Sequence, residues 1–150
     1  MIRVFHEQGK TIFNTSMPDD ESRHYFTDSN PGSRESGSPT ALWVRTAEGA
    51  KPVPTPGIGI PADVHITPDG KTLYFTEFAA ENSFILSMTW IGNGWSSPEK
   101  VSELQMDAGA SYVTSTRSGE KVFSSAGDIY LLEKGEPGKL PANINSEQGE

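Results

Sequence analysis

The feature that most constrains this chain is an internal repeat of short predicted strands and tight turns. Phe26, Phe75 and Phe123 occupy the same place in three successive copies, and they lie 49 and 48 residues apart. A unit of this length is one supersecondary motif, which cannot bury its apolar faces until neighbouring copies stack on it. The repeat therefore predicts an array of similar units.

The second copy shows the unit most clearly. Residues 63–67 and 72–77 are rich in β-branched and aromatic side chains, and the turn 68–71 (Pro-Asp-Gly-Lys) joins them. The proline presets φ, the aspartate can bond the backbone two residues on, and the glycine accepts a positive φ. A third run, 83–90, reaches a fourth, 95–101, across an Asn-Gly turn, which is a strong hairpin signal. The copy therefore predicts four strands and three tight reversals.

The same order of elements appears on both sides of this copy. Turn lengths differ by one residue, which turns tolerate better than strand interiors do. Asp19 and Asp69 are expected to form turns by bonding their own backbones, and the Ser-, Gly- and Pro-rich segment 29–40 predicts a mobile loop. The upstream strands are predicted at 12–17, 25–28, 41–44 and 49–53, and the downstream strands at 111–116, 121–124, 127–132 and 138–140.

Four short antiparallel strands at a period of 40 to 50 residues are typical of β-propeller blades. A β-sandwich would explain the strands but not the repeated turn chemistry. We therefore predict an all-β fold with about three four-stranded antiparallel blades of an incomplete propeller. The predicted parts are 1–11 (an N-terminal strand or the remnant of a preceding blade), 12–61 (blade 1), 62–110 (blade 2) and 111–150 (blade 3 plus a linker toward a missing blade).

Composition narrows the possible partners. Twelve Lys and Arg against 20 Asp and Glu give a net charge of −8, which disfavours a nucleic-acid or anionic-membrane surface. The absence of cysteine excludes disulfides, a thiol nucleophile and a thiolate metal site. No apolar run reaches the ~18 residues of a membrane helix, and the first residues do not form the apolar core of a signal peptide.

Three segments resemble a known repeat. The stretch 67–75 (Thr-Pro-Asp-Gly-Lys-Thr-Leu-Tyr-Phe) is similar to the strand and turn signature of the WD40-like β-propeller repeat found in the Tol periplasmic system and its relatives. Residues 127–131 and 94–98 resemble the third and fourth strands of that repeat. The outer copies depart from the pattern at Asp20, where glycine is usual, and at 117–118, where Pro-Asp is usual. The resemblance implies the propeller fold and, because its bacterial members are mostly exported, a periplasmic or extracellular location.

Three blades cannot close a ring, because propellers close with about four to eight. Three explanations follow: a segment of a longer protein, a half-propeller that pairs two-fold into a six-bladed ring, or an open stack of three blades. An uncovered terminal blade would expose an apolar face and strand edges. We therefore expect further blades in a longer chain or, as the next choice, a homodimer.

The candidate ligand-binding residues lie in the second copy. Asp63 and His65 alternate on one face of a first strand, and such strands line the central channel of a propeller. They suggest a metal or acid–base site, but the simpler interpretation of His65 is a hydrogen-bonded packing residue between blades. Glu77, Glu81 and Asn82 are placed in the loop after the second strand, at the channel rim, where the simpler interpretation is a solvated loop.

No strong catalytic or cofactor motif occurs. The histidines lack zinc-binding spacing, and no calcium loop, nucleophile elbow, phosphate loop or dinucleotide fingerprint is present. We therefore predict no catalytic residue, no metal and no cofactor. The strand aromatics are expected to be core, with sugar stacking by Trp90 or Trp95 as an alternative.

The sequence thus favours a non-catalytic propeller segment that serves as a protein- or saccharide-binding scaffold. The alternative is part of a propeller enzyme, either a polysaccharide lyase or the propeller domain of a serine peptidase. The family resemblance includes all these functions and supports the fold better than any activity.

Overall fold

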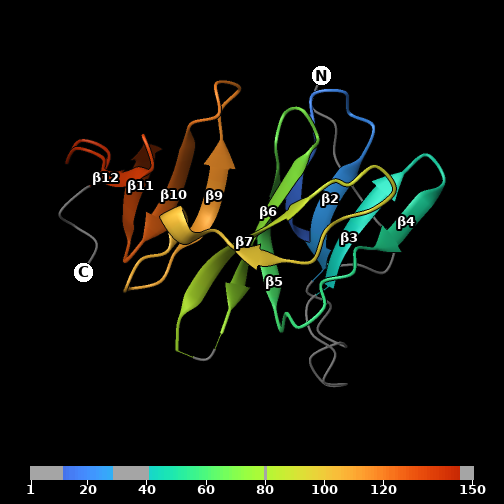
Figure 1. The fold of residues 1–150 in the computed structure, drawn as a ribbon, viewed down its shortest axis with the longest axis horizontal. Coiled ribbons are helices and arrows are strands. Elements are labelled where there is room, and N and C mark those ends of the chain that lie inside the picture. The colour runs from blue at the N-terminus through green and yellow to red at the C-terminus, as the bar shows by residue number, and fades with distance from the viewer. Residues whose placement is uncertain (1–11, 29–40, 80, 146–150) are drawn as a thin grey trace.

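The computed structural model describes residues 12–28, 41–79 and 81–145, and it places them in three antiparallel sheets of four strands each (Figure 1). Within each sheet the strands follow one another in chain order, joined by reversals. The predicted all-β architecture of three four-stranded blades is confirmed. Among the described residues no sheet shares a strand with another, so each is a self-contained meander that packs an apolar face against the next sheet.

Each sheet contains one copy of the repeat. The predicted loop 29–40, the N-terminal segment 1–11 and the last part of the predicted linker, 146–150, lie outside the described residues, and the domain boundaries stay predictions. The strands are β1 (Ile12–Ser16), β2 (His24–Asp28), β3 (Ala41–Thr46), β4 (Gly49–Pro52), β5 (Pro61–Ile66), β6 (Thr72–Phe78), β7 (Ser83–Thr89), β8 (Glu99–Lys100), β9 (Ser111–Ser115), β10 (Lys121–Ser125), β11 (Asp128–Glu133) and β12 (Glu136–Lys139), with a 3-10 helix η1 (Ser102–Leu104) between β8 and β9.

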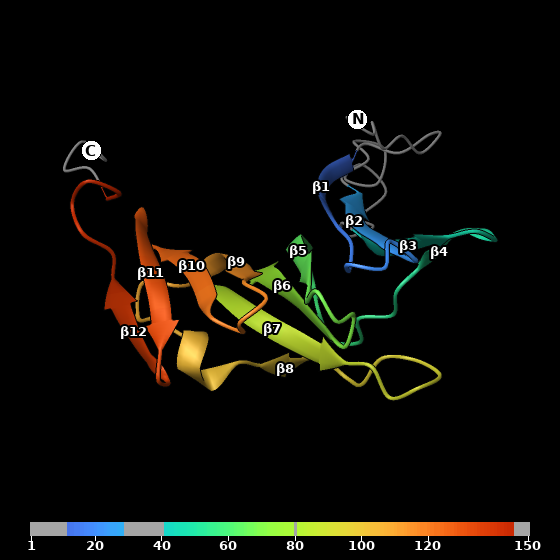
Figure 2. The same cartoon turned by 90° about the horizontal axis from the view of Figure 1, so that it is seen from above.

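The sheets stand side by side, with the β5–β8 sheet between the other two (Figure 2). Their first strands, β1, β5 and β9, lie along one side of this row, and β5 contacts both of the others. This is the arrangement of propeller blades, in which first strands face the axis. It brings residues one repeat apart into contact.

The strand pairing explains why the repeat interval is not constant. His65 of β5 pairs with Tyr74 of β6, whereas the equivalent pair in the third sheet, Thr114 and Val122, encloses one residue fewer. The missing residue belongs to the turn, because the ladder between each pair and the turn has no register shift. The shorter turn therefore accounts for the interval of 48 residues between Phe75 and Phe123.

The turn chemistry is confirmed in the second sheet and corrected in the first. The Asp69 carboxylate accepts hydrogen bonds from the Thr67 hydroxyl (2.7 Å) and the Lys71 N–H (3.0 Å), and these bonds hold its pKa below the usual value. In the first sheet this role belongs to Asp20, which accepts bonds from the N–H and hydroxyl of Ser22. The prediction for Asp19 is wrong. The repeat interval of 49 residues makes Asp20, and not Asp19, the equivalent of Asp69.

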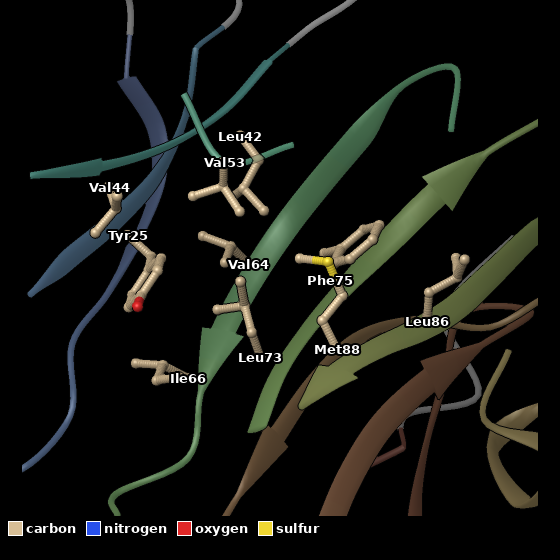
Figure 3. Packing of buried hydrophobic residues seen from close by; sticks show 10 residues of the cluster. All are labelled: Tyr25, Leu42, Val44, Val53, Val64, Ile66, Leu73, Phe75, Leu86 and Met88. Atoms are coloured by element: carbon tan, nitrogen blue, oxygen red, sulfur yellow. The ribbon is translucent and has the colours of Figure 1, made fainter. Parts of the chain in front are cut away.

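The largest apolar core lies between the first and second sheets (Figure 3). It is made by alternate residues, which a strand presents to one face, and burial of each large side chain contributes roughly 1.5–3 kcal/mol. Val64 and Ile66 of β5 point into it, as the alternation with Asp63 and His65 predicted. The buried members are Tyr25, Leu42, Val44, Val53, Val64, Ile66, Leu73, Phe75, Leu86 and Met88.

A second core lies between the second and third sheets. Tyr74 and Ile85 of the second sheet pack against Val113, Phe123 and Leu132 of the third. Tyr74 occupies the repeat position of Tyr25, which packs in the first core, so successive sheets use the same face to contact the next one. Of the strand aromatics expected to be core, Tyr74, Phe75 and Phe123 are buried, whereas five are only partly buried: Trp43, Phe84, Trp90, Trp95 and Tyr130.

The fourth strand of the second sheet is shorter than predicted. The sequence indicated 95–101, but β8 covers only Glu99 and Lys100, and Trp90 and Trp95 form an isolated bridge. Pro98 has no N–H to give to a ladder, and the Ser96 hydroxyl takes the bond from the Thr89 N–H (3.0 Å) that a backbone carbonyl would otherwise accept. Residues 96–98 therefore lie outside any strand.

Candidate functional site

The first strands of the three sheets converge on a hollow of about 280 Å³ on the axial side of the molecule. Asn14 of β1, Asp63 of β5 and Tyr112 of β9 line it, and they lie 49 residues apart in sequence. They therefore occupy one position of the repeat. Only Asp63 was a candidate from the sequence, and the signal that would have found the other two is their equivalence to it.

An irregular backbone presents these three residues. The strand register shifts beside each of them, between Ile12 and Asn14, between Ala62 and His65, and between the partners of Val122 and Ser124. Asp63 and Tyr112 adopt φ of 50° and 54°, in the left-handed region. Aspartate tolerates this region, but a tyrosine there is strained by about 1–3 kcal/mol. Bulges of this kind re-aim side chains, and they gather near functional sites.

Asp63 is the electrostatically perturbed member of the site. Burial raises the pKa of its carboxyl, while hydrogen bonding with the side chains of Thr76 and Asn14 opposes the rise. Its Oδ2 atom is buried and has no hydrogen-bond partner among the described residues. The Thr76 hydroxyl also accepts the Tyr112 N–H (3.3 Å), which connects the second and third sheets beneath the hollow. An unpartnered carboxylate oxygen beside a hollow is an acceptor that a ligand can satisfy.

His65 lines the same hollow but is engaged between sheets. Its Nε2 atom accepts the Ser115 N–H (3.0 Å) and lies 2.7 Å from the Ser115 hydroxyl oxygen. Its ring stacks on Tyr74 at 6.4 Å between centroids, and burial lowers its pKa. An imidazole that accepts a backbone N–H through Nε2 is neutral, with its proton on Nδ1. This geometry matches the packing interpretation of His65.

Glu77, Glu81 and Asn82 lie away from the hollow that Asp63 and His65 share. Glu77 belongs to β6 and not to the loop, and its carboxylate accepts the Gly59 N–H (3.3 Å). Glu81 is exposed. The Asn82 side-chain oxygen accepts the Ser83 N–H (2.9 Å), which shapes the turn. The structure therefore separates the five candidate residues into an axial pair and a group at the β6–β7 end of the second sheet.

A larger hollow of about 640 Å³ opens beside the turns between first and second strands. Arg117 of the third sheet pairs there with Asp19 of the first, with Nε 3.1 Å from Oδ2 and a nitrogen 3.2 Å from Oδ1. The Arg117 and Asp19 side chains are 82% and 55% exposed. Solvent screening makes such a pair weak, so it orients the turns more than it holds the sheets together.

Within residues 12–28, 41–79 and 81–145, no three His, Asp or Glu side chains come close enough to hold a metal ion. None of the described helical segments has the length and hydropathy needed to span a lipid bilayer.

Comparison with known proteins supports the fold. No protein-family model matches the sequence, and neither does any curated protein. Among solved structures, TolB from Acinetobacter baumannii is similar over 87% of this chain and 32% of its own, with a TM-score of 0.63 and 16% identity. A gluconolactonase from Xanthomonas campestris is similar over 93% of this chain and 51% of its own, with a TM-score of 0.59 and 18% identity.

This chain spans about a third of the length of the first of these structures and about half of the second. At such identities a likeness shows the fold and not the activity. Both solved proteins are β-propellers, and the likeness covers most of this chain. The chain therefore has the fold of an incomplete β-propeller.

Proposed function

We propose that this chain is a non-catalytic propeller segment that binds a protein or saccharide ligand at the axial hollow. The observation that carries this proposal is the set of equivalent residues Asn14, Asp63 and Tyr112, which three strained or irregular first strands present to one space. Backbone strain held by the surrounding ladders is typical of binding sites.

The ligand chemistry follows from Asp63 and Tyr112. Asp63 has a buried acceptor oxygen that no described residue bonds, so a ligand that donates an N–H or O–H supplies the missing bond. Tyr112 is 59% exposed and offers an aromatic surface beside it. Protein amines and amides and saccharide hydroxyls are all suitable donors. Thr76, which binds the Tyr112 N–H, fixes the relative position of the two residues.

The engagement of His65 supports binding over catalysis. Its Nε2 atom is committed to Ser115, so it is not free to act as a base or metal ligand in this arrangement. The raised pKa of Asp63 and the likeness to a gluconolactonase make a lactone hydrolase the second candidate. We further propose a periplasmic or extracellular location and completion of the ring by further blades or a second copy.

The test compares wild type with Asp63→Asn, because asparagine keeps the shape and tolerates the left-handed backbone. Asp107→Asn, at an exposed aspartate, is the matched control. Each protein is applied to a glycan array and a peptide array, and the affinity of each ligand found there is measured by calorimetry. We expect a ligand whose affinity falls about tenfold in Asp63→Asn and not in the control.

Two outcomes contradict the proposal. Hits that bind both variants equally lie outside the axial hollow. If the wild type hydrolyses gluconolactone, as measured by proton release, and Asp63→Asn abolishes this activity, the result supports the enzyme instead.

A further inference from the structure

A groove of about 510 Å³, separate from the two hollows described above, lies between the first and second sheets, and nothing in the proposed function uses it. The hairpin Trp90 to Trp95 forms one wall, and the β3–β4 hairpin with the residues that follow it forms the other. Its volume is within the range typical of ligand-binding pockets. Its lining is mainly apolar and aromatic, so a ligand has to supply apolar surface.

The aromatic wall is rigidly built. Trp90 and Trp95 meet nearly edge to face, with ring centroids 5.3 Å apart and planes at 71°. Tyr25 meets Trp95 in the same manner, at 5.8 Å and 76°. The isolated bridge between Trp90 and Trp95 fixes the backbone below the rings. Half-buried aromatic side chains in such a fixed arrangement are the usual anchors of recognition surfaces.

Two cations accompany the aromatic rings. The Arg23 guanidinium lies over the Trp90 ring, 4.8 Å from its centroid, and donates one hydrogen bond to the Gly70 carbonyl (3.3 Å). Arg23 also makes a hydrogen bond with the Tyr25 side chain, and its remaining N–H groups can serve further acceptors. Lys51 lies on the opposite wall and is exposed. No carboxylate is among the described residues that line the groove, in a chain whose net charge is −8.

Two carboxylates, Asp20 and Glu48, lie near the groove but do not line it. Asp20 lies near Arg23, but its carboxylate accepts the bonds of Ser22 described above. Glu48 lies near Lys51, and its carboxylate accepts the Thr46 hydroxyl (2.5 Å). Both carboxylates keep their charge near these cations, but neither lines the groove, so the lining itself presents only positive charge, which complements an anionic ligand.

We propose that this groove binds an acidic peptide segment of a partner protein, with an aromatic or proline residue on Trp90 and Trp95 and carboxylates toward Arg23 and Lys51. Aromatic-lined grooves take extended, proline-containing peptides. A saccharide is less suited, because it needs many neutral hydrogen-bonding side chains. Apart from Tyr25 and the indoles, the described lining residues offer only Thr46 and Asn93, and Thr46 is bonded to Glu48. The charge of the rim therefore selects the occupant.

The experiment uses three synthetic peptides of one design: Glu-Glu-Phe-Pro-Pro-Glu-Glu and the versions with every Glu replaced by Gln or by Lys. Each carries fluorescein, and binding is measured by anisotropy. We expect the acidic peptide to bind about tenfold more tightly than the Gln peptide and the Lys peptide to bind most weakly. The affinity of the acidic peptide should fall between 50 and 500 mM NaCl, since salt screens the contact.

Variants locate the binding on the protein. Lys51→Gln removes an exposed charge and should weaken the acidic peptide about threefold to fivefold, while Arg23→Gln should weaken it about fivefold or more. Lys139→Gln, on β12 of the third sheet, is the matched control and should have no effect. Lys51→Gln keeps the test valid if Arg23→Gln disturbs folding, because the Lys51 side chain is exposed.

Three results overturn the proposal. The first is equal affinity for the three peptides or no binding of the acidic peptide at millimolar concentration. The second is an effect of Lys139→Gln as large as that of Lys51→Gln. The third is binding of a neutral oligosaccharide, cellohexaose, that is lost in Trp95→Ala while the acidic peptide is not bound. None of these results depends on Asp63, so the axial site is tested separately.

Discussion

Replacement of His65 by alanine tests the connection between the second and third sheets. His65 accepts the Ser115 N–H at 3.0 Å and stacks on Tyr74. The substitution leaves a partly buried N–H without its partner, at a cost of about 1–3 kcal/mol, and removes a ring contact that contributes roughly 0.5–1.5 kcal/mol. Because His65 is only half-buried, water can replace part of the lost bond. We expect the free energy of unfolding to fall by about 2 kcal/mol.

The pH dependence gives a second and independent measure. Burial lowers the pKa of folded His65 below the ordinary value of 6.5, so the unfolded chain binds a proton more readily than the folded one. The stabilisation by neutral His65 is therefore complete above pH 6.5 and is lost as the pH falls from there toward the folded pKa. One group changes the unfolding free energy by at most about 1.4 kcal/mol per pH unit. This dependence should disappear in His65→Ala.

Urea unfolding of both proteins at pH 5 to 8 measures both effects. Thr114→Ala, at an exposed neighbour on β9, is the control and should shift the midpoint little. The reasoning is refuted if His65→Ala loses less than about 0.5 kcal/mol at pH 7.5 with an unchanged denaturant slope. It is also refuted if wild type and variant lose stability in parallel below pH 6.5.

Three further predictions concern other parts of the molecule. Asp63→Asn should raise the unfolding free energy at pH 7 by about 1 kcal/mol, because it removes a charge from a buried oxygen that has no partner among the described residues. Since burial raises the folded pKa of Asp63, the gain over wild type should vanish as the pH falls below that pKa. A constant gain in urea titrations from pH 3 to 7 would exclude this cause. Gly109→Ala should lower the unfolding free energy by about 2–3 kcal/mol, because φ is +80° and a Cβ would lie 2.3 Å from the Asn82 side-chain oxygen. Gly127→Ala, at φ +81° in open space, is the control and should cost about 1 kcal/mol. Equal losses of stability in thermal unfolding would contradict the contact. Arg117→Gln should lower stability by less than about 1 kcal/mol at low salt, and a larger loss in the same assay would show that its exposed pair with Asp19 holds the sheets together.

The sequence was sufficient for most of the strands, with β8 as an exception, because the signals that determine them are local. The turn around Asp69 and the alternation of Val64 and Ile66 with Asp63 and His65 involve neighbours in the chain, and the structure shows both. The shift of the turn role from Asp19 to Asp20 needed only the alignment of the repeats. Where strands that are neighbours in the sequence pair with each other, the residue pattern and the turn chemistry were enough to predict the structure.

The candidate sites depended on contacts between distant residues, and the sequence predicted them only in part. The left-handed backbone of Tyr112 has no local signal, since tyrosine does not favour it, and arises from the ladders on either side. The contact between Arg23 and Trp90 joins residues from two blades. The same is true of His65 and Ser115, whose bond follows from the stacking of sheets. Such contacts depend on the relative placement of blades, which periodicity alone does not give.

The spacing of the bulged residues has a consequence for how this scaffold can be altered. Asn14, Asp63 and Tyr112 keep an interval of 49 residues. The turn after β9, which follows Tyr112, is one residue shorter than the turn after β5, yet β9 and β5 both pair with the strand that follows them. A first strand therefore keeps its pairing when the turn after it changes length. The outward hairpin at 91–94 and the turn at 117–120 are accordingly the places where added residues, such as an epitope or a label, should be accepted without disturbing the axial residues.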